Sequence, residues 1–309
     1  MRTDVSFPSA GLKIAAHLYM PDAPTAQPRP AIIVGHPGSA VKEQTAGLYA
    51  RHLADQGFIT LAFDAAHQGE SEGLPRGLED PAQRVEDFKA ATSYLSALDT
   101  VDPARIGALG ICASGGYVIA AAATDTRIRA VATVSAADIG RHFRHGADGT
   151  LSPAVLRQML DAATTARTAE ARGDGMGALP LFPATADEAQ AQGRHAFEGY
   201  EYYCTDRGRH PRSAKTLTWS SIDRIAAFDA FRFIDMIAPR PLLLVVGSEA
   251  VTAWMAQEAF RLAREPKQWA WIEGATHVDL YDREVPVTAA VEKLSAFFAA
   301  NLAGRDEVG

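Results

Sequence analysis

The chain has 309 residues, 47% of them hydrophobic, so it can bury a larger core than a compact unit of roughly 100–150 residues needs. Its 30 basic and 37 acidic residues give a formal net charge of -7, without a long Lys/Arg run, which argues against nucleic acid as a partner. The first residues lack the apolar core of a signal peptide, and no stretch approaches the roughly 18 apolar residues of a membrane span. We therefore expect a cytoplasmic protein without a membrane partner.

Short apolar runs alternate with segments of helical periodicity, which is typical of a mostly parallel, buried sheet. The expected strands are 13–20, 31–35, 59–64, 106–111, 130–135, 242–247 and 268–272. Helical patterns cover 44–56, 82–98 and 287–302. The alternation predicts an α/β fold with a twisted, doubly wound sheet flanked by helices.

The alternation stops between about residues 140 and 235, where helical pieces such as 153–171 mix with His, Arg, Gly and aromatic residues. The segment has no clear buried strand, and its aromatic residues argue against disorder. We interpret residues 141–235 as a helical cap inserted after the sixth sheet strand, and residues 1–140 and 236–309 as the core.

The most specific motif is Gly-Ala-Leu-Gly-Ile-Cys-Ala-Ser-Gly-Gly at 107–116, followed by a helix of small residues at 117–123. An abrupt turn from strand to helix needs small residues two places either side of the turn, and Gly110 and Ser114 fit. This is the nucleophile-elbow pattern with Cys112 at the turn. The following helix dipole and a neighbouring imidazolium would favour the thiolate. Ser114 as the nucleophile is a weaker alternative, because it would shift the elbow into the helix.

His277 follows the last predicted strand, where the base of an α/β-hydrolase arrangement lies. The run Gly-His-Pro-Gly-Ser at 35–39 resembles a turn that supplies an oxyanion donor. Because Pro37 has no N–H, the expected donors are the amides of Gly38 and of Ala113, the residue after the nucleophile.

The acid is less well defined. A carboxylate is expected just after the strand 242–247, three residues past its terminal Gly, but Ala250 stands there. Glu249 is the first candidate, and Asp138, after the sixth strand, is the second. A Cys/His pair without a carboxylate is the third reading.

Four segments resemble the dienelactone hydrolase-like branch of the α/β-hydrolases: GHPGSAVKEQ, AFDAAHQGES, LGICASGGY and IEGATHVDLYD. The chain looks similar to bacterial cysteine hydrolases of this branch and to fungal polyketide transferases. The resemblance implies a Cys/His/acid site with no metal or other cofactor, acting on a small acyl substrate. A homodimer is compatible with the sequence.

The expected activity is hydrolysis of an activated ester, lactone or thioester through an acyl-Cys112 intermediate. Two alternatives remain open at the level of sequence. One is an acyltransferase that uses the same Cys/His site, and the other is a non-catalytic ligand-binding protein on a hydrolase scaffold.

Overall fold

The computed structural model describes residues 1–22 and 27–304. Its main feature is an eight-stranded sheet of order β1-β2-β4-β3-β5-β6-β9-β10, in which β1 and β2 run antiparallel to their neighbours and the other strands are parallel. The strands are β1 (Arg2–Ser9), β2 (Leu12–Tyr19), β3 (Arg29–Gly35), β4 (Ile59–Phe63), β5 (Val101–Ile111), β6 (Ile128–Val134), β9 (Leu242–Gly247) and β10 (Lys267–Ile272). All seven expected strands are present, and the largest difference is the earlier start of β5.

Strand β1 was not expected from the sequence. It lies at the edge of the sheet and pairs only with β2. Phe7 and Ser9 are buried, but most of its other residues are exposed. The segment therefore has no continuous apolar run, which is why its pattern does not stand out as a buried strand.

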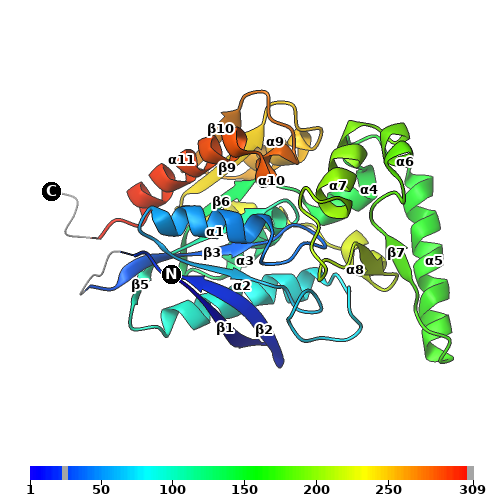
Figure 1. Ribbon diagram of the computed structural model, residues 1–309, viewed down its shortest axis with the longest axis horizontal. Coiled ribbons are helices and arrows are strands. Elements are labelled where there is room, and N and C mark those ends of the chain that lie inside the picture. The colour runs from blue at the N-terminus through cyan, green and yellow to red at the C-terminus, as the bar shows by residue number, and fades with distance from the viewer. Residues whose placement is uncertain (23–26, 305–309) are drawn as a thin grey trace.

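Helices cover both faces of the sheet and enclose two separate cores (Figure 1). One face carries α1 (Thr45–Asp55) and α11 (Glu284–Asn301). The other carries α2 (Pro81–Ser96), α3 (Ser114–Thr124), α9 (Ala253–Leu262) and the short η1 (Ile234–Ile237). Ile33 points into the second core while Ile32 and Val34 point into the first, as the alternation of side chains along a strand requires.

The segment between β6 and η1 gathers to one side of the sheet (Figure 1). Its elements are α4 (Ile139–His145), α5 (Pro153–Ala171), β7 (Ala178–Pro180), α6 (Ala186–Ala191), α7 (Arg194–Cys204), β8 (Thr216–Thr218) and α8 (Ser221–Ala226). The segment is mostly helical, but β7 and β8 form a small antiparallel pair that the sequence did not indicate.

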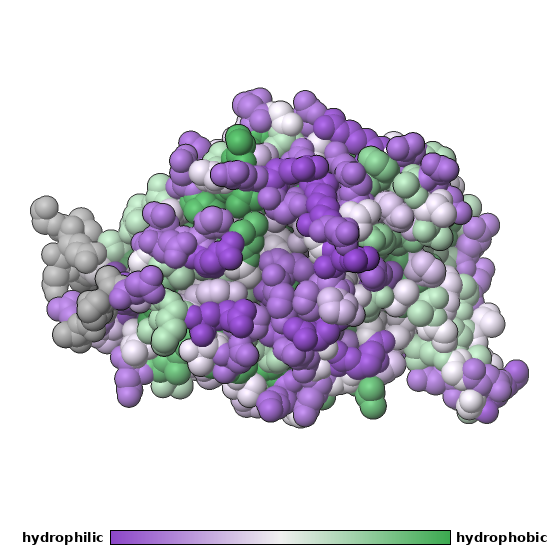
Figure 2. Space-filling model, in the orientation of Figure 1, coloured by the Kyte–Doolittle hydropathy of each residue, from purple (hydrophilic) through white to green (hydrophobic). Residues whose placement is uncertain are grey.

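Hydrophilic residues cover the middle of the face seen in Figure 2, with apolar residues in scattered groups. Within residues 1–22 and 27–304, no helix has the length and apolar character needed to cross a membrane.

A buried ion cluster joins the turn after β4 to the loop after β3. The Lys42 ammonium lies 2.9 Å from Asp64 and 2.5 Å from Glu70, and Lys42 and Asp64 are both buried. Burial opposes the charged form of Lys42, but the neighbouring carboxylates outweigh it and raise its pKa. Asp64 also accepts hydrogen bonds from the backbone N–H groups of Lys42, at 2.7 Å, and Glu70, at 2.9 Å. The cluster therefore fixes the two loops to each other.

We predict that Lys42→Met lowers the free energy of unfolding by about 3–5 kcal/mol, because it leaves the buried Asp64 carboxylate without its partner charge. Urea denaturation measures the change. Lys293→Met, at an exposed position, is the matched control and should change stability by less than about 0.5 kcal/mol. Equal stabilities of the two variants would contradict the role given to the cluster.

Candidate active site

Cys112 occupies the sharp turn between β5 and α3. Its φ of 54° lies in the left-handed region, which residues other than glycine rarely adopt. The turn brings the backbone so close that a Cβ placed on Gly110 would lie 2.0 Å from the carbonyl oxygen of Ser114. Gly110 is therefore required by the close approach, as the sequence motif indicated, and the turn lifts the sulfur above the end of the sheet.

Two backbone amides face the sulfur. The N–H groups of Gly38 and Ala113 both lie within hydrogen-bonding reach of the Cys112 side chain. These are the two donors expected from the sequence. Donors from two different loops that converge on one point can hold the oxygen of a carbonyl under attack at that point.

Ser114 and Arg84 hold the loop that carries Gly38. The buried Ser114 hydroxyl donates to the carbonyl oxygen of His36 at 2.6 Å, and the Arg84 guanidinium donates to the same oxygen at 3.0 Å. The His36 ring in turn accepts from the backbone N–H of Ala65 at 3.0 Å. The Ser114 hydroxyl thus has a structural partner, and His36 contributes to loop architecture.

His277 lies on the loop between β10 and α10 (Asp279–Asp282) and is buried. The loop passes so close to the end of β9 that a Cβ on Gly247 would lie 2.3 Å from the carbonyl oxygen of Ala275. The Ser135 hydroxyl donates to the backbone carbonyl of His277 at 3.1 Å. These contacts fix the imidazole at the same end of the sheet as Cys112.

The two candidate acids lie elsewhere. Glu249 is half exposed, and its carboxylate accepts from Arg194 at 2.6 Å. Asp138 is the N-cap of α4, and its carboxylate accepts from the backbone N–H groups of Gly140, at 2.8 Å, and Ala230, at 3.0 Å. Neither carboxylate is hydrogen-bonded to His277. The sequence predicted that one of these carboxylates orients His277, and the observed contacts differ from that expectation. Glu249 is instead in an ion pair with Arg194, and Asp138 caps α4.

Thr252 takes the position expected of the acid. Its hydroxyl oxygen lies 2.5 Å from Nδ1 of His277, and both residues are buried. Sequence reasoning missed Thr252 because it searched the loop after β9 for a carboxylate, although Thr252 belongs to that loop. A hydroxyl can orient the ring but brings no negative charge to stabilise an imidazolium.

On the opposite side of the ring, Nε2 of His277 lies 3.1 Å from the hydroxyl of Tyr281, and the same hydroxyl hydrogen-bonds the Cys112 side chain. Sequence reasoning also missed Tyr281. The available signal was its spacing of four residues from His277, which places two side chains on one side of a helical turn.

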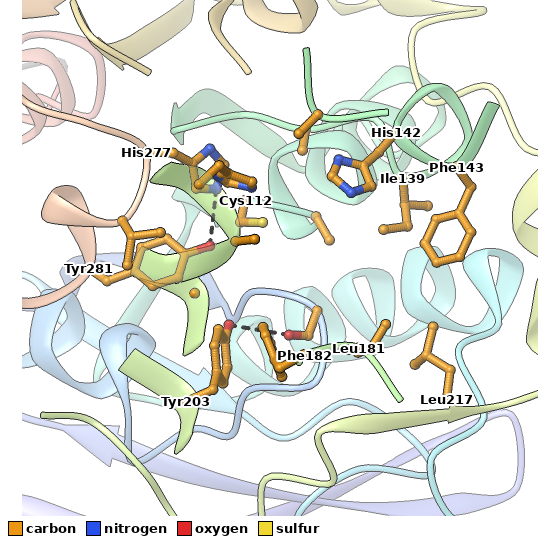
Figure 3. A pocket seen from close by; sticks show the side chains of 18 of the residues that line it. Cys112, Ile139, His142, Phe143, Leu181, Phe182, Tyr203, Leu217, His277 and Tyr281 are labelled. Atoms are coloured by element: carbon orange, nitrogen blue, oxygen red, sulfur yellow. Dashed lines mark hydrogen bonds between the residues drawn. The ribbon is translucent and has the colours of Figure 1, made fainter. Parts of the chain in front are cut away.

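A cavity of about 250 Å³ opens beside the sulfur. Figure 3 shows Cys112, His277 and Tyr281 at one end and side chains of the inserted segment opposite them. Its apolar lining includes Ala137, Ile139, Phe143, Ala147, Leu181, Phe182, Leu217 and Val278. Two further imidazoles, His142 and His195, also line it, and the rings of His195 and His277 are 5.2 Å apart.

Burial dominates the electrostatics of the site. It raises the pKa of the Cys112 thiol above its ordinary value, and this outweighs the stabilisation that Tyr281 and the amides of Ala113 and Gly38 give the thiolate. Burial also lowers the pKa of His277 well below its ordinary value, with smaller contributions from His195 and His142. The resting site is thus a neutral thiol beside a neutral imidazole, and the thiolate expected from the helix dipole is not favoured.

The sheet order, the elbow after β5 and the histidine loop after β10 are those of the α/β-hydrolase fold. The crystal structure of the protein PA2218 from Pseudomonas aeruginosa shares this architecture, with a TM-score of 0.91 and 34% identity over 97% of this chain and 94% of that chain.

Residues 10–279 match the family model described as X-Pro dipeptidyl-peptidase (S15 family), and the chain belongs to this family. It is 38% identical to the protein YcjY from Escherichia coli (strain K12), over 98% of this chain and all of that protein. It is also 27% identical, over 86% of its length and 83% of the relative, to the thiohydrolase aneE from Aspergillus aculeatus. The relatives of this chain therefore include proteins named as a thiohydrolase and as an acyltransferase.

We predict that Thr252→Val lowers kcat/KM, because it leaves Nδ1 of the buried His277 without a partner. An unsatisfied buried polar group costs about 1–3 kcal/mol, or roughly 5- to 150-fold in rate. Steady-state kinetics on an activated ester measures the loss. Thr252→Ser keeps the hydroxyl and should retain activity, and Glu249→Gln should remain close to wild type. A large loss in Glu249→Gln with none in Thr252→Val would restore Glu249 as the orienting acid.

The pH dependence of kcat/KM reports the protonation state of His277. A base must be neutral to accept a proton, and the pKa of His277 lies well below 6.5. We therefore expect kcat/KM to stay level as the pH falls from 8 to 6.5 and to decline only at lower pH. The measurement is a pH–rate profile for one activated ester whose own hydrolysis is subtracted. An acidic limb centred at or above pH 6.5 would contradict a buried, neutral imidazole.

Proposed function

We propose that this protein is a cysteine-dependent hydrolase that cleaves an activated ester, a lactone or a thioester through an acyl-Cys112 intermediate. The observation that carries the proposal is the sulfur at a left-handed elbow, facing the amides of Gly38 and Ala113 in a cavity that His277 also lines. This combination offers a nucleophile, a base and an oxyanion site around one point.

The proposed reaction begins when the proton of Cys112 passes to His277 and the sulfur forms a bond to the substrate carbonyl carbon. The carbonyl oxygen, now negative, accepts hydrogen bonds from the amides of Gly38 and Ala113, which the sulfur held before. The bond to the leaving group then breaks, and the imidazolium returns its proton to that group. Water attacks the acyl-enzyme with His277 as base, and the sulfur regains a proton when the acid is released.

Leaving-group chemistry narrows the substrate class. A thiolate is itself a good leaving group, so the tetrahedral intermediate expels the sulfur again unless the substrate's own leaving group is comparably good. Thioesters, enol lactones and activated esters meet this condition better than simple alkyl esters or amides. The apolar walls of the cavity suit an acyl chain, and two relatives of this chain are named thiohydrolases.

Acyl transfer is the second candidate, in which an alcohol, amine or carbanion replaces water. A relative named an acyltransferase, from Aspergillus calidoustus, is 25% identical over 87% of this chain. Product analysis with and without acceptors separates the two reactions. Acid release that is independent of the acceptor supports hydrolysis, and acceptor-dependent turnover with little acid supports transfer.

We predict that Cys112→Ala abolishes turnover of one activated thioester, while Ser114→Ala lowers it only through loss of the hydrogen bond to the loop of Gly38. The measurement is kcat/KM of both variants beside wild type, with circular dichroism as the folding control. An X-Pro anilide in the same assay tests the peptidase activity that the family description names.

Turnover that is lost in Ser114→Ala and kept in Cys112→Ala would move the nucleophile to the serine. A third outcome would favour the alternative that the protein binds a ligand without catalysing a reaction. If wild type turns over none of the esters, thioesters or anilides and its Cys112 does not react with iodoacetamide, the catalytic proposal fails.

A further inference from the structure

Tyr281 lies at the centre of the site, although none of the proposed acylation steps uses it. It belongs to α10, four residues after His277, and its side chain is buried. Its hydroxyl oxygen is 3.1 Å from Nε2 of His277, the ring nitrogen not engaged by Thr252. The same hydroxyl hydrogen-bonds the side chain of Cys112. Figure 3 shows the tyrosine ring reaching the space beside the sulfur and the imidazole.

No direct hydrogen bond joins Cys112 to His277 among the contacts of residues 1–22 and 27–304. The tyrosine hydroxyl and two backbone amides hydrogen-bond the Cys112 side chain, and the same hydroxyl hydrogen-bonds Nε2 of His277. Proton transfer is efficient along groups that are hydrogen-bonded to one another. The observed geometry therefore offers a continuous path between the two groups through the hydroxyl of Tyr281.

We propose that Tyr281 is a catalytic relay that carries the proton between Cys112 and His277. In the forward step the S–H proton moves to the tyrosine oxygen while the O–H proton moves to Nε2. The sulfur becomes nucleophilic, the imidazole becomes imidazolium, and the tyrosine is neutral before and after. The two transfers run in reverse when the sulfur is released. The inference rests on the proposed function, since it specifies how the base of that reaction is reached.

The surroundings of Tyr281 favour coupled transfer over a stable tyrosinate. Burial raises the pKa of its phenol well above the ordinary value, and the nearby Cys112 and Tyr203 raise it further. Burial therefore disfavours a lasting negative charge on this oxygen. A relay that receives one proton as it gives up another never holds that charge.

Neighbouring rings also fix the position of the hydroxyl. The ring of Tyr281 packs edge-on against Tyr202, at 5.1 Å, and against His277, at 5.6 Å between ring centres. Tyr202 itself engages the backbone N–H of Thr45 at 3.1 Å. Tyr202 thus offers a matched control, since it is a buried tyrosine next to Tyr281 whose hydroxyl contacts neither the sulfur nor the imidazole.

The test compares Tyr281→Phe with Tyr202→Phe in rapid-quench acylation by an activated thioester. We expect Tyr281→Phe to slow acylation by at least about 100-fold, the lower end of the contribution of proton transfer. Tyr202→Phe should acylate within a few-fold of wild type. Thermal unfolding of both variants reports any loss of folding. A purely structural role of Tyr281 would lower stability but would leave the solvent isotope effect on acylation unchanged.

A proton inventory of the acylation step, measured in mixtures of H2O and D2O, separates a proton relay from a structural role. Once the low deuterium fractionation of the resting S–H group is divided out, two protons moving together give a curved dependence of rate on the deuterium fraction of the solvent, and one proton gives a straight line. We expect curvature in wild type and in Tyr202→Phe, and a straight line for the residual acylation of Tyr281→Phe. Wild-type acylation rates in Tyr281→Phe, or a straight line in wild type, would overturn the relay.

Failure of the relay and failure of the proposed function are distinguishable. If Cys112→Ala retains turnover, the cysteine mechanism itself is lost. If Cys112→Ala is inactive but Tyr281→Phe acylates at the wild-type rate, the nucleophile stands and the proton reaches His277 directly.

Discussion

The turn at Cys112 determines the arrangement of the whole site. A non-glycine residue in the left-handed region stores about 1–3 kcal/mol of strain, which persists only where the surrounding structure holds it. Here the close approach at Gly110 and the packing of α3 under the sheet hold it. The left-handed conformation turns the chain sharply between β5 and α3, and this turn places the sulfur next to the amides of Gly38 and Ala113.

Burial is the second determinant, and it changes the chemistry expected from a helix dipole. The dipole contributes roughly 0.3–1 kcal/mol at an exposed helix end. Desolvation of a buried thiol is larger, so the pKa of Cys112 rises and the cysteine rests as a thiol. A thiol must lose its proton during the attack, which makes the path to His277 decisive. The hydroxyls of Thr252 and Tyr281, one on each ring nitrogen, then define how that imidazole works.

The sequence predicted the parts of this architecture that are set by local patterns. Buried parallel strands read as apolar runs, and the elbow has small residues at fixed spacing, so Cys112 and its two neighbouring amides could be located in advance. Strand β1 could not, because an edge strand with one buried face carries a weak signal. The orienting partner of His277 could not be found either. Loop conformation decides whether Glu249 or Thr252 turns toward the ring, and Arg194, which pairs with Glu249, lies 55 residues away in the chain.

Acylation of Cys112 is the step on which the proposed chemistry depends, and mass spectrometry of the trapped intermediate tests it most directly. The enzyme would be mixed with an activated thioester or ester, quenched in acid within milliseconds, digested and mapped. We expect an acyl group on the peptide that contains Cys112, with its mass added at the sulfur and lost again as product forms. An acyl group on Ser114, or full turnover with Cys112 unmodified at every time point, would contradict it.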